Sequence, residues 1–456
     1  MKISNSIFFK IQKKKIVESI FKRSIKTIPK SVDIKIDESI KIGDFKNYKN
    51  HPGKYKIKYI ELPPELEDRI NKVLGNFNIP QFREQINNFR RYLHDRRCPS
   101  EKNDIYYLKR QIREEIQPNE TDEADPEKFE KELQKILKSK IHPWLKIEYT
   151  ERLSYLYLAS RFATDYAVLI EIFNQIKKRD EKFTPKNIFD FGSGLGSVMW
   201  ASKSVWNDDS LGFFNVDSSS YMNNIATLIT KNGSIGNPSC FKHMYFKRNF
   251  PKSDNETYDL VTASFSLFEL PNRASRFENL VLLWNKVKDN GYLVLIENGT
   301  KHGFRLINEA RDFLLDLIEK TKLENTEPNG HIFAPCPHSL KCPLVEENQV
   351  CRFFVGYRPL DIHDLGDNKI DKEEFPYSYL IFKKSPKNSY NKWPRLVYKQ
   401  PLEVSGGIIH SWLCTPEGRV EHLLSSRNRN KTIRSLLKYS KLGDSLPIYL
   451  ENKKDE

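Results

Sequence analysis

Four of the six cysteines are spaced in a way that could hold a metal ion or an iron–sulfur cluster. Cys336, Cys342 and Cys351 follow the pattern C-x5-C-x8-C, and Cys414 comes much later in the chain. Four thiolates satisfy either a tetrahedral zinc ion or a cubane 4Fe-4S cluster. Prolines flank this loop and would make it rigid; they are Pro335, Pro337 and Pro343.

The spacing leaves more than one interpretation open. It lacks the paired C-x2-C knuckles of zinc ribbons, which favours the 4Fe-4S cluster and keeps zinc as the alternative. His331 and His338 are possible substitute ligands or hydrogen-bond donors to the ligands. The purely structural alternative is four unrelated buried thiols. We expect three local ligands and one distant ligand to clamp the C-terminal module onto the domain before it.

A glycine-rich stretch predicts a nucleotide-type cofactor site. The sequence D-F-G-S-G-L-G lies between an apolar strand pattern and a helix start, and an acidic residue follows about 20 residues on at the end of the next strand. Glycine allows a tight turn and a close approach of backbone to ligand. The predicted cofactor-binding residues are Asp190, Gly192, Ser193, Gly194, Gly196 and Asp217.

The details of this stretch favour S-adenosylmethionine over other nucleotides. No G-K-[ST] follows, which argues against a phosphate-binding P-loop. The leading Asp190 could orient an amino group, which favours S-adenosylmethionine over NAD. A degenerate fold that keeps these glycines only for packing remains the alternative.

No catalytic residue is recognisable on the acceptor side. The strand that ends near Ser264 lacks the N-P-P-[YF] motif that holds a flipped base, and no Pro-Cys nucleophile is present. Glu269 is either a base or a surface acid at a strand end. The catalytic residue therefore stays unknown.

Strand and helix patterns alternate around this site. "NIFDF", "LGFFNVD", "YDLVTAS" and "NGYLVLIEN" predict strands, and Tyr149–Ile176, Arg276–Val287 and Phe304–Lys320 predict helices. Such alternation predicts a parallel, doubly wound α/β sheet. Short β patterns recur after residue 385. The expected segments are 1–30 (targeting), 31–148 (helical, basic), 149–325 (Rossmann-like), 326–385 (cysteine-rich, with closing strands) and 386–456 (β-rich).

The charge balance points to a polyanionic partner. The chain of 456 residues has 75 Lys and Arg against 60 Asp and Glu, a formal charge of +15. Such a surplus favours RNA through counterion release, although lysine-rich codon usage is an alternative. Arg90, Arg91, Arg96 and Arg97 could contact phosphate, but a solvated helix face is the simpler explanation.

The ends and the apolar runs suggest where the chain works. The first 30 residues are basic, acid-poor and interleaved with apolar residues, which is typical of an organelle transit peptide or of a disordered basic arm. No apolar run is long enough to span a bilayer, so we expect no membrane partner.

Several of these segments together resemble the methyltransferase-like family of the mitochondrial small ribosomal subunit. Its members are known in fungi as a small-subunit ribosomal protein and in animals as methyltransferase-like protein seventeen. The matching stretches run in order over roughly two-thirds of the chain. They are "YLASRFATDYAVL", "DFGSGLGS", "YDLVTASFSLFELP", "LVLIENGTKHGFRLINEAR", "HIFAPCPHSLKCPL", "CRFFV", "SYLIF", "WPRLV" and "CTPEGRVEHL".

The resemblance implies a class I methyltransferase Rossmann-like fold with a helical N-terminal extension and a Cys-rich, β-rich C-terminal module. It implies a mitochondrial matrix protein that binds small-subunit rRNA and ribosomal proteins near the head–body junction, and not DNA. The family's cluster cysteines map onto Cys336, Cys342, Cys351 and Cys414. Asp217 departs from many relatives, which have Glu there, but keeps the ribose contact possible.

Three functions follow from these observations. The first is an assembly factor or ribosomal protein with a methyltransferase-like scaffold and a 4Fe-4S cluster. The second is an active S-adenosylmethionine-dependent rRNA methyltransferase. The third is an iron-sensing regulator of mitochondrial translation.

Overall fold

The computed structural model divides the chain into two compact units. It describes residues 26–27, 29–32, 50–75, 79–116, 126–141, 145–250, 256–321, 329–360, 372–386, 393–426 and 431–450. The first unit, here called the Rossmann unit, comprises Ile57–His331 and Phe354–Lys387. The second, here called the cysteine unit, comprises Met1–Lys56, Ile332–Phe353 and Asn388–Glu456.

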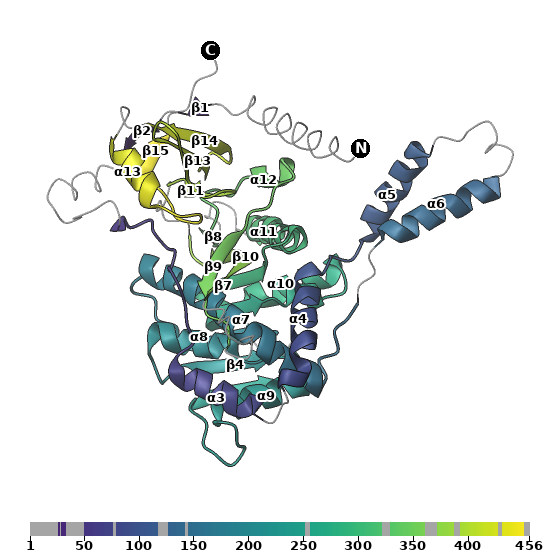
Figure 1. Cartoon of the computed structure of the whole chain (residues 1–456), viewed down its shortest axis with the longest axis vertical. Helices are drawn as coiled ribbons and strands as arrows, with labels where there is room; N and C mark the ends of the chain where they lie inside the picture. Colours follow the sequence, from purple (N-terminus) through teal and green to yellow (C-terminus); the bar gives the residue numbers. More distant parts are fainter. Residues whose placement is uncertain are drawn as a thin grey trace, which may run out of the picture. The chain divides into compact units, whose positions relative to one another are not determined.

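A mostly parallel β-sheet forms the centre of the Rossmann unit (Figure 1). Its strands run in the order β5-β4-β3-β6-β7-β10, with β9 paired to β10. All pairs from β5 to β7 are parallel, and β10 is antiparallel to β7. The strands are β3 (Asn187–Phe191), β4 (Gly212–Val216), β5 (His243–Lys247), β6 (Tyr258–Ser264), β7 (Val287–Asn298), β9 (Phe353–Tyr357) and β10 (Glu373–Lys383).

Helices cover this sheet and leave β7 without an exposed face. Every residue of β7 from Gly291 to Asn298 is buried, as expected for a strand with helices on both sides. Helices α10 and α11 contact each other and β7, while α7 contacts α8 and α9. The bounds are α7 (Glu151–Arg179), α8 (Ser197–Trp206), α9 (Ser220–Thr230), η2 (Leu267–Glu269), α10 (Arg273–Lys286) and α11 (Lys301–Thr321).

The long helix α7 is buried over most of its length. The Thr150 side chain caps it by accepting a hydrogen bond from the Leu153 N–H, and Lys177, Lys178 and Arg179 occupy its last turn. Cap and charges both stabilise the helix ends. Its apolar residues surround the helix rather than forming one stripe, so it can serve as a central helix of the unit.

The N-terminal extension is helical, as predicted. It consists of α3 (Pro64–Leu74), α4 (Ile79–Asp95), α5 (Lys102–Glu115) and α6 (Pro126–Lys140). Helix α4 contacts α7, α3 contacts α9, and α5 and α6 contact each other. None of the helices that the structure describes is both long and apolar enough to cross a membrane.

The arginines of the α4 region are not all solvated, which corrects the simpler sequence interpretation. Arg90 forms an ion pair with Glu373 and donates to the Tyr357 hydroxyl at 2.8 Å. Arg96 forms an ion pair with Glu269. The chain brings these acids from positions far along the sequence, so the arginines of these two pairs hold the fold together.

The cysteine unit is a small β-rich module with one helix on its sheet. Its main sheet has the order β1-β14-β13-β11, with β12 on β13, and β15 pairs with β2. The elements are β1 (Lys26–Thr27), β2 (Pro29–Val32), β8 (His331–Ala334), α12 (Pro343–Glu346), β11 (Arg395–Leu396), β12 (Leu402–Val404), β13 (Ile408–Cys414), β14 (Val420–Ser425), α13 (Lys431–Tyr439) and β15 (Ile448–Leu450).

A compact apolar core and one buried carboxylate hold the cysteine unit together. Ile433, Leu436 and Leu437 of α13 join aliphatic residues of the strands in one buried cluster. The fully buried Asp444 accepts backbone N–H bonds from Tyr55 at 2.8 Å and from Lys441 at 2.7 Å. This carboxylate ties the segment around residue 55 to the C-terminal part of the chain.

The predicted fold class is confirmed, and the remaining differences are local. The sequence missed the strand β5 and the helix α13. The segment 326–385 supplies residues to both units, because its last strand β10 completes the Rossmann sheet. Of the predicted targeting segment, residues 1–25 and 28 lie outside the described residues, whereas β1 and the start of β2 pair with β14 and β15.

Candidate functional site

A polar pocket lies where strands β3, β4 and β6 end in the Rossmann unit. The turn after β3 supplies Asp190 and the glycines, and Asp217 follows β4. The pocket is lined from this turn, from α7 and from the end of β6. Its lining residues are Tyr157, Phe162, Asp165, Asp190, Gly192, Ser193, Gly194, Leu195, Ser197, Val198, Ser264 and Phe265. Ligands of doubly wound sheets bind at this edge.

The glycines of the turn have two different tasks. Gly192 has φ +70°, and a Cβ there would lie 2.5 Å from the Ser266 Cβ. Gly194 has φ +50°, but a Cβ there would meet nothing nearer than the Gly192 carbonyl oxygen at 4.0 Å. Gly192 is therefore required for packing, whereas Gly194 leaves open space beside the pocket.

Asp190 is a buried carboxylate with one oxygen unused. Its Oδ1 accepts a hydrogen bond from the Thr262 hydroxyl at 2.7 Å, and none of the described residues bonds its Oδ2. Burial raises the pKa of Asp190 to about 7, with a smaller contribution from the charge of Asp217. A buried carboxylate oxygen without a hydrogen bond favours a cationic ligand group. Such a group would compensate the carboxylate for the hydration that it loses on burial.

Asp217 holds the glycine turn in place. Its Oδ2 accepts the Gly194 N–H at 2.9 Å and its Oδ1 accepts the Ser219 N–H at 2.8 Å. Burial raises the pKa of Asp217. Each carboxylate oxygen can accept a second hydrogen bond, so the side chain remains able to bind the two hydroxyls of a ribose.

A buried ion pair on α7, which the sequence analysis missed, forms another wall. Arg161 pairs with Asp165 at 2.8 Å, and Asp165 accepts a hydrogen bond from the Tyr157 hydroxyl at 2.7 Å. The guanidinium lies over the rings of Phe265 and Phe375 at 4.6 and 4.5 Å. The only sequence signal was a pair of opposite charges four residues apart in an apolar helix.

The acids near the end of β6 lie outside the lining of the pocket. Glu269 is bound by Arg96 and accepts a long hydrogen bond of 3.4 Å from the Tyr149 hydroxyl. Glu297 is fully buried, and its Oε1 accepts the Leu267 N–H at 2.8 Å. Burial raises the pKa of Glu297 to about 8. Neither acid lines the pocket.

The pocket is narrow. The pocket has a volume of about 340 Å³ when its opening to solvent is included. Only about 20 Å³ of this volume is accessible to a water molecule. Sites for cofactor-sized molecules measure roughly 300 to 1,000 Å³. A nucleoside cofactor would therefore require the wall of the pocket to move.

The four cysteines of the C-x5-C-x8-C…C pattern all lie in the cysteine unit. Cys336 follows β8, Cys342 directly precedes α12, Cys351 precedes β9, and Cys414 ends β13. They come from two distant segments of this one unit and not from both units, which corrects the expected clamp onto the Rossmann unit. Leu340 packs on the β13–β14 turn, because a Cβ on Gly418 would lie 2.9 Å from its Cδ1.

The sulfur atoms act on one another electrostatically. Burial, followed by the charges of Cys342, Cys336 and Cys414, raises the pKa of the Cys351 thiol well above its usual value. Arg395, whose backbone pairs with Cys414, lowers it by a smaller amount. Among the described residues, no three His, Cys, Asp or Glu side chains are already arranged around one metal-ion position.

One of the two candidate histidines lies beside Cys414. The Nε2 of the buried His338 lies 3.3 Å from the Cys414 sulfur. His331 instead bonds the Ser385 carbonyl through Nδ1 at 3.0 Å, and both residues are in the Rossmann unit. His338 is therefore placed to contact a ligand sulfur, and His331 is bonded elsewhere.

Comparison with known families shows which family the chain belongs to. Residues 151–447 match the family model described as mitochondrial small ribosomal subunit Rsm22. The chain belongs to this family. A human member, the mitochondrial ribosome assembly protein METTL17, is 32% identical over 402 residues, which cover 88% of this chain and 86% of the human protein.

More distant relatives cover less of the chain. The budding-yeast mitochondrial ribosome assembly protein RSM22 is 25% identical over 280 residues, 42% of this chain and 44% of the yeast protein. Among solved structures, the N-methyltransferase NodS of Bradyrhizobium japonicum with S-adenosyl-L-homocysteine is 10% identical over 50% of this chain and 89% of NodS, with a TM-score of 0.31. A putative S-adenosylmethionine-dependent methyltransferase of Methanococcus maripaludis has 20% identity, 39% and 74% coverage and a TM-score of 0.26.

The buried Asp190 predicts a specific pH dependence of stability. Its folded pKa of about 7 lies above the unfolded value, which is about 4. Its stabilising contribution is therefore complete below about pH 4 and is lost as the pH rises towards about 7. Asp190→Asn should unfold at a higher temperature than the wild type at about pH 8, and this advantage should shrink at about pH 5. The measurement is thermal unfolding of the ligand-free protein at both pH values.

The control is Asp316→Asn, which removes an exposed carboxylate of α11 paired only with Lys320. Its difference from the wild type should be small at both pH values. An Asp190→Asn difference that did not grow with pH would contradict the assignment.

Proposed function

We propose that this protein is an assembly factor of the mitochondrial small ribosomal subunit and works in the matrix. The observation that carries this proposal is the match to a human mitochondrial ribosome assembly protein, which covers 88% of the chain. We further propose that the protein binds small-subunit rRNA and ribosomal proteins near the head–body junction. The charge of +15 supports an RNA partner, since positive side chains gain from counterion release.

The cysteine unit is proposed to carry a 4Fe-4S cluster held by Cys336, Cys342, Cys351 and Cys414. The donor set fits, because burial and the charges of the other three sulfurs raise the pKa of the Cys351 thiol, so the four thiols need a cation to ionise together. A bound metal centre supplies folding free energy and neutralises the thiolates. Zinc, which accepts the same four ligands, is the alternative metal.

The Rossmann unit is proposed to act as a scaffold. Glu269 is occupied by Arg96, and the pocket that a water molecule can enter measures about 20 Å³. A site of this kind offers neither a free base nor room for a cofactor without movement. The sheet still holds its covering helices in place, and its strand β7 pairs with β10.

A second candidate function, S-adenosylmethionine-dependent methylation of rRNA, rests on one observation. Asp190 keeps a buried, unpartnered Oδ2 in the pocket, and Asp217 holds the turn with lone pairs to spare. Both carboxylates fit the amino and ribose groups of that cofactor. They would bind and orient the cofactor, while the source of any catalytic proton transfer stays unassigned.

The cluster proposal is tested by replacing a ligand with serine. Cys342→Ser and Cys414→Ser should each lose the brown visible absorption and the bound iron, because a hydroxyl is a poor substitute for a thiolate. Without the metal centre the cysteine unit should become sensitive to protease, and the protein should no longer co-sediment with the small subunit. Iron and zinc analysis of the purified wild type identifies the metal.

Cys240→Ser is the matched control, since Cys240 is a half-buried thiol of the Rossmann unit. It should keep the metal and the ribosome association. Variants of Cys342 and Cys414 that retain the full metal content would refute the proposed ligand set.

His338 should stabilise the cluster through its contact with Cys414. A metal-bound sulfur carries no proton, so Nε2 must be the donor of the 3.3 Å hydrogen bond. His338→Leu should lose the cluster to a chelator about 10- to 100-fold faster than the wild type, the usual effect of removing such a partner. His338→Gln retains an N–H donor and should recover part of the loss, which a merely space-filling role would not explain.

The methyltransferase candidate is tested at Gly194. Asparagine tolerates positive φ, so Gly194→Asn should keep the fold while its side chain crowds the pocket. If the enzyme hypothesis holds, S-adenosylmethionine binding and one specific rRNA methyl mark should be lost while subunit assembly continues. Unchanged methylation would favour the scaffold. Gly406→Asn is the control, since Gly406 has φ +83° and open space around it in the cysteine unit.

A further inference from the structure

Helices α5 and α6 form a helical hairpin with its own small core. Ile112 of α5 and Leu133 and Leu137 of α6 are buried against one another. Glu130 of α6 accepts hydrogen bonds from Lys109 at 2.7 Å and from Arg113 at 3.1 Å, both on α5. These contacts hold the two helices as a pair.

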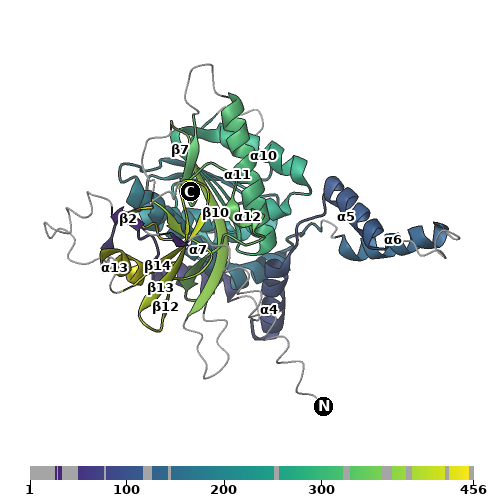
Figure 2. The same ribbon diagram turned by 90° about the horizontal axis from the view of Figure 1, so that it is seen from above.

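The hairpin is tied to the rest of the Rossmann unit at its base. Glu101, which precedes α5, pairs with Arg276 at 2.8 Å and also accepts the Arg273 N–H. Asp104 in the first turn pairs with Arg305 at 2.7 Å. Beyond this base the two helices stand clear of the sheet in both views (Figures 1 and 2). The hairpin therefore presents its outer faces to solvent.

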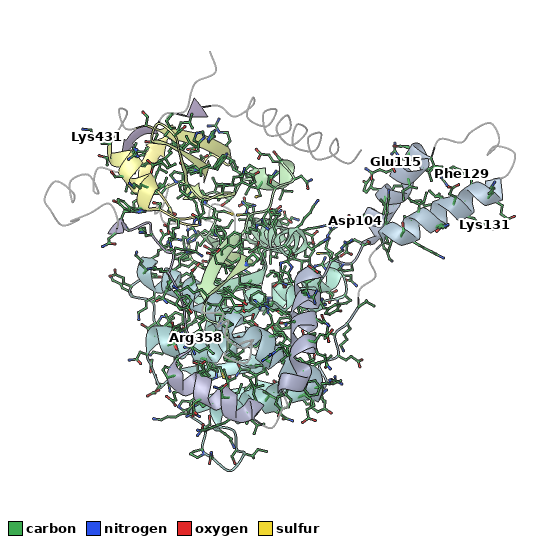
Figure 3. The ribbon with its side chains drawn as sticks, in the orientation of Figure 1. Asp104, Glu115, Phe129, Lys131, Arg358 and Lys431 are labelled. Carbon is green, nitrogen blue, oxygen red and sulfur yellow. The ribbon has the colours of Figure 1, made fainter. Side chains whose placement is uncertain are left out.

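One outer face of α6 is a stripe of lysines. These residues recur at intervals of three, four and three, which places them on one side of the helix, and all four are exposed; they are Lys128, Lys131, Lys135 and Lys138. The stripe is about 15 Å long at the helical rise. Leu133 and Leu137 occupy the opposite side, and Figure 3 shows Lys131 pointing away from α5.

The C-terminal half of this stripe is not neutralised by any residue that the structure describes. Lys135 and Lys138 form no ion pair with any described residue, whereas the arginines at positions 90 and 96 are engaged by Glu373 and Glu269. Lys131 pairs with Glu127, but both side chains are exposed. Such a pair contributes little and can exchange its partner.

Charge chemistry distinguishes between the possible partners of this face. The stripe presents ammonium groups without an apolar centre, whereas protein interfaces are built around an apolar core. Lysine ammonium groups arranged in a row can contact successive phosphates of a nucleic-acid backbone. Acidic residues at 120–125 precede α6 in the sequence and would repel phosphate near the start of the helix. The contact is therefore expected around Lys135 and Lys138.

Two exposed tyrosines on α5 add to the same chemistry. Tyr106 and Tyr107 are 67% and 63% exposed, with ring centroids 5.7 Å apart. Arg110, also exposed, follows Tyr106 by one helical turn. Exposed aromatic rings next to basic side chains are typical of surfaces that bind single-stranded nucleic acid.

We propose that the α5–α6 hairpin is an RNA-binding arm, in which Lys135 and Lys138 contact the phosphate backbone of ribosomal RNA. This inference rests on the proposed function, which requires an rRNA partner. It assigns that contact to a part of the chain that lies before the family match at residues 151–447.

The test compares two double variants of the full-length protein. Lys135→Gln/Lys138→Gln removes two charges from the stripe. Lys182→Gln/Lys186→Gln removes two exposed charges from the loop between α7 and β3. Binding of each protein to in vitro transcribed small-subunit rRNA is measured over a series of salt concentrations. Circular dichroism checks that each variant is folded.

The arm variant should bind more weakly and should lower the slope of log affinity against log salt by about two, one for each lost phosphate contact. The loop variant should leave the slope close to that of the wild type. Equal slopes for wild type and arm variant, or equal losses in both variants, would overturn the arm. Unchanged RNA binding together with loss of co-purifying ribosomal proteins would overturn it in favour of a protein contact. If the wild type bound no rRNA, the proposed function would fall as well.

Discussion

Four neighbouring thiols, two buried and two half-buried, cannot all be ionised together unless a cation lies among them. The raised pKa of Cys351 expresses this constraint, since burial and the three other sulfurs all oppose its ionisation. Without a cation the thiols remain protonated and contribute only weak hydrogen bonds. With one, the same four groups become strong ligands that join residues 336–351 to the end of β13. We therefore expect the proposed cluster to join these two parts of the cysteine unit more firmly than the protonated thiols do.

This constraint explains why the cysteine unit is assembled from distant segments. Its apolar core lies between the strands and α13, and the loop from Cys336 to Cys351 contributes little to that core. Small modules with limited cores commonly need a metal or a disulfide to remain folded. Asp444 also joins distant segments of the unit. Its buried carboxylate accepts hydrogen bonds from backbone N–H groups near both ends of the unit.

The sequence predicted the elements with strong periodicity and the residues with distinctive chemistry. The parallel strands β3, β4, β6 and β7, the helices α7, α10 and α11, the helical N-terminal extension and the C-terminal strands β11, β13 and β14 were predicted. Strand β5 was missed because its residues "HMYFK" alternate between exposed and half-buried positions, and none of them is fully buried. Helix α13 was missed because β patterns surround its short amphipathic stretch. In both cases tertiary packing, rather than local pattern, determines the structure.

In the candidate sites, too, residues in a local motif could be recognised from the sequence, whereas contacts between distant residues could not. Asp190, Gly194 and Asp217 were recognisable because a turn that approaches a ligand requires those residue types at that spacing. The pairing of Arg96 with Glu269 was not recognisable, since its partners lie far apart in the chain. Yet this ion pair determines whether the Glu269 carboxylate is available as a base. The sequence alone therefore could not show whether Glu269 can take part in catalysis.

The two units differ in whether their buried ionisable groups are compensated within the protein. This difference is the physical basis for proposing different roles for the two units. In the Rossmann unit, Arg161 and Asp165 are compensated by each other and by neighbouring rings, so this wall of the pocket is stable without a ligand. Asp190 keeps one buried oxygen without a hydrogen bond, as do several other buried side chains of this unit, among them Glu297. In the cysteine unit the sulfurs compensate nothing among themselves, and the nearby Arg395 lowers the pKa of Cys351 by less than burial raises it. We therefore infer that the Rossmann unit can persist as a scaffold with such atoms unsatisfied, whereas the proposed cluster would supply the cation that the four thiols lack.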